Sequence, residues 1–360
     1  METDRFMKWY FALPKLLLRE TRRGGKGKGN AEVAARFAAV REDNWGELLQ
    51  LLARDEEAER RRRAANGRRR RVEGDPDEEK AKLSKTVLCK ISRGQVGQAR
   101  RLAVSPGVAR MSDLGVKETM QTKYPARSRP LPASVVRGTA LDSLPGLKET
   151  MLDLMPGVSG GFGSLMNEFL RCAAQNWDDQ ELARFEEFCL MYVNVELRPW
   201  VYCVANSASS VALFKSSARD PSLLRPLAIK ASPVRMLHRE VILANRASFR
   251  EHLEPEQLAL SPGCGSKIVH IVRMMLEARQ DFVCVALDFK NAHNEVSRAA
   301  VVEEIQEVES LRHLALHMAS YLAPAHRLDA SGEAWGVAEE GEAQGDPEAS
   351  AVFVSRFTPM

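Results

Sequence analysis

The chain has 360 residues, enough for two or three domains with a sizeable hydrophobic core. Hydrophobic residues make up 44% of it and charged residues 28%, a balance that excludes a wholly disordered protein. The formal net charge is +4, but the first hundred residues carry the basic excess and the remainder is mildly acidic. This asymmetry favours an anionic partner for the N-terminal part.

The six cysteines form no CxxC pair, and no histidine lies at zinc-ligand spacing from them. We therefore expect free thiols in a reducing compartment and no disulfide partner. No run approaches the ~20 apolar residues of a membrane span. The apolar start of the chain is broken by Pro14 and Lys15, so we expect neither a signal peptide nor a membrane partner.

Residues 1–128 are predicted to form a basic, helical and partly disordered N-terminal region, which ends in the Pro-rich stretch Tyr124–Pro132. Two blocks of four arginines flank Asn66-Gly67: Arg60, Arg61, Arg62 and Arg63, then Arg68, Arg69, Arg70 and Arg71. The blocks fit a solvated helix end beside a linker, a nuclear-import signal, or a nucleic-acid-binding patch for phosphates.

Residues 129–210 are predicted to be a helical lead-in, with helices at about 145–155 and 163–195. The Gly-rich stretch between them, "MPGVSGGFGS", lacks the GxxxxGK[ST] pattern of a nucleotide-binding P-loop. Asp178-Asp179 is interpreted as a helix N-terminus.

A β-hairpin is predicted next, because two strand-like runs, Val211–Phe214 and Leu224–Ile229, flank a polar turn. Lys215 and Arg225 stand at its two margins. They could pair with surface acids, or they could clamp a triphosphate, with lysine as a point charge and arginine as a fork.

An amphipathic helix is predicted over 266–280, followed by a buried strand, Phe282–Leu287, that ends in Asp288. A lone carboxylate at the end of a buried strand is costly without a partner, which could be a hydrogen bond, a basic side chain or a metal ion. A further helix is predicted from about Ser297, with Ser297 as its N-cap.

A second hairpin, "HRLDASGEAWGVAEE", leads into "GEAQGDPEASAVFVSRF". Here Asp346 is predicted to cap a last helix, with Pro347 at its first position.

Taken in order, these stretches resemble the reverse transcriptase domain of non-LTR (LINE-like) retrotransposons over roughly residues 140–357. "MPGVSGG" is similar to the family's Pro-Gly-x-Ser/Asp-Gly turn, and "VALFK…LRPLAI" to its fingers hairpin. "VALDFKNAHNEV" looks like the first catalytic motif, and "EAQGDP" like the Gln-Gly-Asp-Pro motif.

The resemblance implies an α+β fold: an incomplete fingers and palm of the right-hand polymerase type in residues 211–360, with no thumb. It also implies an RNA-directed DNA polymerase, a nucleotidyltransferase of a transposable element. Its partners would be an RNA template, a DNA primer and a deoxynucleoside triphosphate (dNTP). The implied location is nuclear, otherwise cytoplasmic.

The resemblance also assigns roles to single residues. The carboxylate of Asp288, the catalytic residue, and the main-chain carbonyl of Phe289 would hold Mg²⁺. The nucleotide-binding residues would be Lys215, Arg225, His293, Gln344 and Gly345. His293 replaces a family aromatic residue that excludes ribonucleotides. It is consistent with relaxed sugar discrimination, with a decayed copy of the element, or with an ordinary surface or half-buried histidine.

The chain departs from the family in two respects that bear on activity. No Asp-Asp hairpin follows Gln344, and only 13 residues follow Pro347, so we expect a truncated and inactive polymerase. Glu348 and Ala349 stand where the family tends to have Leu and Gly or Ser. The alternatives are a non-catalytic nucleic-acid-binding protein and a degenerate remnant of an element.

Overall fold

The computed structural model describes residues 34–36, 38, 39, 42, 44, 46–48, 50, 51, 53, 54, 57, 76–92, 100, 102–128, 130, 138–161, 165–329 and 332–355; for residues 76–80 and 82 it describes the backbone alone. The chain divides into two compact units: Met1–Gly107 with Ser216–Ala218, and Val108–Lys215 with Arg219–Met360. Residues 108–128, predicted from the sequence to be part of the N-terminal region, belong to the second unit. The arginine blocks Arg60–Arg63 and Arg68–Arg71 lie outside the described residues.

The first unit contains helix α4, Pro76–Ser92. The helices of the second unit are α6 Val116–Gln121, α7 Leu147–Leu152, α8 Asn167–Asn176, α9 Asp179–Val193, α10 Pro199–Asn206, α11 Ser232–Ala244, α12 Arg246–Leu253, α13 Cys264–Ala278, α14 Ala292–Glu295, α15 Arg298–Glu307, α16 Ala315–Ala319 and α17 Ala349–Ser355, with 3₁₀ turns at Arg312–Leu314 and Ser320–Leu322.

One five-stranded mixed sheet belongs to the second unit: β1 Val108–Ala109, β2 Ala208–Phe214, β3 Leu224–Lys230, β4 Ala325–Leu328 and β5 Ala334–Ala338. Strand β3 pairs antiparallel with the whole of β2, from Ala208 opposite Lys230 to Phe214 opposite Leu224. The other edge of β2 is shared by β1, which is antiparallel to it, and β4, which is parallel. Strands β4 and β5 pair antiparallel, from Ala325 opposite Ala338 to Leu328 opposite Ala334. Both predicted hairpins are therefore confirmed, and the mixture of helices with one mixed sheet is compatible with the expected α+β class.

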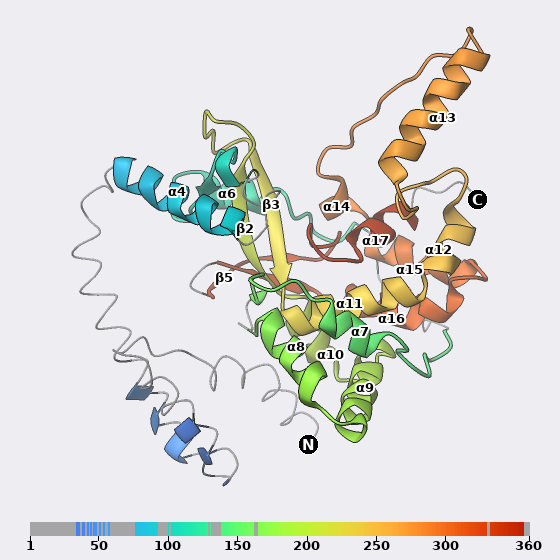
Figure 1. The fold of residues 1–360 in the computed structure, drawn as a ribbon. Coiled ribbons are helices and arrows are strands. Elements are labelled where there is room, and N and C mark those ends of the chain that lie inside the picture. The colour runs from blue at the N-terminus through green and yellow to red at the C-terminus, as the bar shows by residue number, and fades with distance from the viewer. Residues whose placement is uncertain are drawn as a thin grey trace. The chain divides into compact units, whose positions relative to one another are not determined.

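A hydrophobic cluster joins α6 to the sheet. Val116 and Met120 of α6 are fully buried against Ala212, Leu224 and Trp335 of β2, β3 and β5. In Figure 1, α6 lies against the β2–β3 hairpin, whereas α7 to α11 gather at the other end of that hairpin. The hairpin is thus held by packing at both ends.

Helix starts follow the local polar signals of the sequence. Asp178 forms a capping box with Glu181 at the start of α9, and Ser297 caps α15 by accepting the Ala300 N–H at 3.5 Å. Helix α17 begins at Ala349, two residues later than predicted. Asp346 still accepts the Glu348 N–H at 3.0 Å, as a capping side chain does.

The predicted strand Phe282–Leu287 is wrong. Residues 281–290 are exposed and pair with none of the five described strands. Strand propensity alone cannot form a strand, because its N–H and C=O groups need a neighbouring strand. Asp288 consequently lies on an exposed segment and not at the end of a buried strand.

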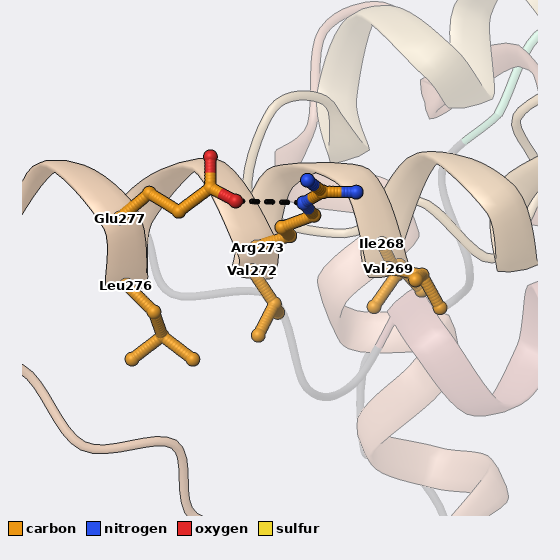
Figure 2. Close-up of a pocket in the computed structure, with 6 residues that line it drawn as sticks. All are labelled: Ile268, Val269, Val272, Arg273, Leu276 and Glu277. Carbon is orange, nitrogen blue, oxygen red and sulfur yellow. Dashed lines mark hydrogen bonds and ion pairs between the residues drawn. The ribbon is translucent and has the colours of Figure 1, made fainter.

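We call α13 and residues 282–289 together the apolar arm. Helix α13 matches the predicted amphipathic helix but buries none of its residues, and it extends away from α12 and α17 (Figure 1). Ile268, Val269, Val272 and Leu276 line one side of it beside the Arg273–Glu277 ion pair (Figure 2). Val283, Val285 and Leu287 are 84%, 72% and 78% exposed.

All six cysteines carry free thiols. Among the described residues, no helix combines the length and the apolar character that crossing a bilayer requires.

Candidate functional site

A cleft of about 780 Å³ opens in the second unit between the β2–β3 hairpin and residues 287–294. Six of the seven residues to which the resemblance gives a metal-binding or nucleotide-binding role line it: Lys215, Arg225, Asp288, Phe289, His293 and Gln344. These residues come from three segments that are far apart in the sequence. The seventh residue, Gly345, lies next to Gln344.

The hairpin places Lys215 and Arg225 side by side at the cleft. The Lys215 N–H donates to the Leu223 carbonyl at 3.0 Å, which extends the β2–β3 pairing past Phe214. Along β3, Leu224 and Pro226 are buried and Arg225 between them is exposed. The alternation of a strand therefore presents the guanidinium to solvent.

The segment after Asp288 is held by a tight asparagine turn. Asn291 adopts a left-handed conformation with φ of 57°, and its side chain donates to the Lys123 carbonyl at 2.8 Å and to Glu295 at 3.0 Å. The Asn294 side chain donates to Asn291 Oδ1 at 2.8 Å. This turn connects the exposed Asp288 to the buried start of α15.

Gly345 permits close approach of its backbone to β3. Its φ is +115°, a conformation that L side chains rarely adopt, and an added Cβ would lie 3.3 Å from Leu227 Cδ1.

Unpaired basic side chains give the cleft its electrostatic character. Within the described residues, Lys215, Arg225 and Lys290 form no ion pair. Of the two roles predicted for Lys215 and Arg225, pairing with surface acids is therefore not observed there. Burial, and then the charges of Lys215 and Lys290, lower the pKa of Lys123. Lys123, Lys215 and Lys290 all line the cleft, so their like charges there favour an anion.

Asp288 is the one acid among the described residues that line the cleft. No donor within the described part of the chain forms a hydrogen bond or an ion pair with its carboxylate. The carboxylate and the neighbouring Phe289 carbonyl are hard oxygen ligands, which fit Mg²⁺ brought in on a phosphate. A single carboxylate does not by itself hold two metal ions.

His293 lies beside an aromatic ring in the cleft. Its imidazole is 5.1 Å from the Phe353 ring, with 48° between the planes. Sequence reasoning missed Phe353 and Lys123, because neither belongs to a recognisable motif. Lys290 lies two residues after Asp288, so its place in that motif could have identified it as a cleft residue.

Next to the cleft residue Gln344, the chain enters a buried polar network: Lys230, His238, His317, Tyr321, Glu342, Asp346 and Glu348. Lys230 Nζ lies 2.6 Å from Glu342 and 3.4 Å from Asp346. His238 Nδ1 lies 3.0 Å from both Asp346 oxygens, and His317 Nε2 lies 2.7 Å from Glu348 Oε1. The Gln344–Glu348 turn thus has one end in the cleft and the other in the core.

Glu348 lies where the resembled family has an apolar residue, and the structure accommodates it by polar contacts. Its carboxylate forms a hydrogen bond with His317 and accepts another from the Tyr321 hydroxyl. Burial acts to raise the pKa of Glu348, but His238 and His317 outweigh it and hold that pKa below its ordinary value.

The sequence matches no protein-family model and no curated protein.

Proposed function

We propose that the cleft binds a magnesium-complexed deoxynucleoside triphosphate, as the fingers and partial palm of an RNA-directed DNA polymerase of the non-LTR retrotransposon type. The observation that supports this is the gathering of Lys215, Arg225, Asp288, His293 and Gln344 in one cleft. These residues belong to separate sequence motifs that the fold brings together.

The basic residues bind the phosphate groups of the triphosphate. Arg225 offers a planar fork to two phosphate oxygens, and Lys215 and Lys290 add point charges. Their charges offset the anionic triphosphate, as binding needs. The half-buried Lys123 adds a fourth positive charge.

Asp288 and the Phe289 carbonyl would hold the metal ion. When bound, Mg²⁺ neutralises the phosphate oxygens and orients them for in-line attack. The Asp288 carboxylate would supply the negative charge that holds the ion at residues 287–294, across the cleft from the hairpin. Gln344 and Gly345 support the base and the template, and His293 faces the sugar.

Nucleotidyl transfer needs a second metal ion, and Asp288 is the single acid of the described cleft lining. We therefore propose that these 360 residues bind the nucleotide but do not extend a primer by themselves. Extension on an RNA template is expected when a segment carrying an Asp-Asp hairpin is supplied in addition.

The test is the affinity of the full chain for dATP, measured by calorimetry with Mg²⁺ and with a chelator. Arg225→Ala should weaken binding by about tenfold to a hundredfold, the loss of one charge-assisted pair. Asp288→Asn should remove the magnesium dependence and leave residual binding. Arg273→Ala and Asp281→Asn are matched controls, because both are exposed residues of the arm region that lie outside the cleft.

Equal losses in the control variants, or no binding by the folded wild type, would reject the proposal. The second candidate, a nucleic-acid-binding protein without catalysis, is favoured by the same unpaired basic side chains. It predicts binding of single-stranded RNA that falls steeply with salt and survives Asp288→Asn.

A further inference from the structure

The buried polar network contains three side chains, His238, His317 and Glu348, that have no role in the proposed nucleotide site. His238 and Glu348 are 0% exposed and His317 is 1% exposed. His238 comes from α11, His317 from α16, and Glu348 from the turn before α17. Three segments that are distant in the sequence therefore bring two imidazoles and a carboxylate to one point in the core.

Glu348 is the carboxylate of this network that depends on the histidines. Lys230 Nζ lies 2.6 Å from Glu342 and 3.4 Å from Asp346, so one ammonium group serves two carboxylates. Within the described residues, the ion-pair partners of Glu348 are His317 and His238. A buried charge is costly unless it is paired, so positive charge beside these imidazoles would stabilise Glu348.

A cation bound beside the imidazoles could supply this charge. His317 Nδ1 is buried with no acceptor among the described residues, whereas His317 Nε2 lies 2.7 Å from Glu348 Oε1. A metal ion bound at His317 Nε2 would add positive charge next to Glu348 without placing an N–H on both ring nitrogens.

The spacing of the polar atoms fits a metal ion. One ligand atom from each of His238, His317 and Glu348 can be chosen so that all lie within 4.8 Å of one another. His238 Nδ1 lies 3.9 Å from Glu348 Oε2 and 3.0 Å from Asp346, and His317 Nε2 lies 2.7 Å from Glu348 Oε1. Ligand atoms bound at about 2.0–2.2 Å stand about 3.3–3.6 Å apart around a tetrahedral ion. Binding would therefore widen the closest of these separations and shorten the longest.

The surrounding groups are suited to orient these ligands. The other nitrogen of His238, Nε2, lies 3.4 Å from the Tyr192 hydroxyl, and the Tyr321 hydroxyl donates to the second oxygen of Glu348. Metal-ligating histidines and carboxylates are usually held by such outer hydrogen bonds. Imidazole ligands select a transition metal over Mg²⁺.

We propose that His238, His317 and Glu348, with Asp346 as a fourth ligand, bind one divalent transition-metal ion of the zinc class. The ion joins α11, α16 and the Gln344–Glu348 turn. It holds that turn in place from the core side, and this role is independent of what the cleft binds.

The first test is metal content. Untagged full-length protein purified without chelator should contain about one zinc per chain by elemental mass spectrometry. After chelator treatment, Co²⁺ should bind in a one-to-one ratio and give the visible absorption of a tetrahedral site. His317→Asn and Glu348→Gln should each lower the bound metal at least tenfold.

Control variants separate this site from surface binding. His326→Asn and Glu307→Gln change groups outside the network and should leave the metal content unchanged. If the site variants fail to fold, the Co²⁺ titration of the wild type still decides. A folded wild type that holds no zinc and shows no tetrahedral Co²⁺ spectrum would overturn the proposal, and so would equal metal loss in the control variants.

Discussion

The buried polar network and the apolar arm depart from the usual distribution of side chains in opposite directions. The network places two histidines, a lysine and three carboxylates in the core. The arm presents Val283, Val285, Leu287 and one face of α13 to solvent. Charged groups are rarely fully buried without partners, and large exposed apolar patches on a monomer usually mark an interaction site.

The comparison shows that the stability of the network, unlike that of the arm, depends on contacts between its side chains. Each network residue has its ionic or hydrogen-bonding partner within the fold, so a single change there leaves an unpaired buried group. The arm residues contact little, so changes there should leave the fold intact. The two regions should therefore respond to mutation in opposite ways.

The largest effect is expected when one partner is removed from the network. Lys230→Met leaves Glu342 and Asp346 without their lysine, and should lower the free energy of unfolding by about 3–5 kcal/mol. Urea denaturation measures this change. Adding Glu342→Gln to Lys230→Met should restore part of the loss; a double variant no more stable than Lys230→Met would contradict the ion-pair account.

A smaller effect is expected from backbone conformation and space, and two glycines provide a matched pair: Gly341 beside the network residue Glu342, and Gly265 in the arm. Gly341 has a φ of +68°, and an added Cβ would lie 2.3 Å from Asn294 backbone atoms. Gly341→Ala should therefore cost about 2 kcal/mol or more. Gly265, in the first turn of α13, has open space around it, so Gly265→Ala should be neutral or stabilise by at most about 1 kcal/mol. Equal melting-temperature shifts in the two variants would contradict this contrast.

Polar substitutions on the arm should change association and not stability. Val283→Ser with Val285→Ser should alter the free energy of unfolding by no more than about 0.5 kcal/mol, since both side chains are exposed. The same variant should scatter less light at high concentration and bind less of a hydrophobic dye. Val302→Ser, a buried valine of α15, is the control and should destabilise the fold. A stability loss in the arm variant that matches this control would mean that the arm packs against the fold in solution.

The smallest effect concerns the residues just before the arm. Glu254 accepts hydrogen bonds from Arg250 and Ser261, and these bonds, with Arg250 first, lower its pKa to about 2. Because the folded-state pKa is depressed, the stabilisation is present above the unfolded value of about 4.3 and is lost as the pH falls towards 2. A carbon-detected NMR titration measures the midpoint. Arg250→Ala should move it up towards the unfolded value, and an unchanged midpoint would exclude this ion pair in solution.

The local elements could be predicted from the sequence. The β2–β3 hairpin, the capping box at Asp178 and the Ser297 cap depend on residues within a few positions of one another. The run from Phe282 to Leu287 has strand propensity as well, but a strand depends on a neighbour elsewhere in the chain. That is why the propensity of this run did not reveal its exposed conformation.

The candidate site could be predicted only in part, for a similar reason. Lys215, Arg225 and Asp288 stand in motifs, whereas Lys123 and Phe353 join the cleft through tertiary packing. Glu348 contacts His317 and Tyr321, which lie about thirty residues earlier in the sequence, and no local sequence pattern predicts these contacts. The sequence identified Glu348 as unusual but not the network that accommodates it.

The arm also determines where insertions and deletions can be tolerated in the sequence. The elements that flank it, α12 and α14, both contact α17, so the chain leaves the body and returns to it at neighbouring places. Residues between these anchors can be lengthened, shortened or exchanged with little cost beyond that of closing a longer loop, which grows slowly with length. Insertions and deletions among related genes should therefore accumulate between Leu253 and Phe282, while the spacing from Asn291 to Glu348 stays constant.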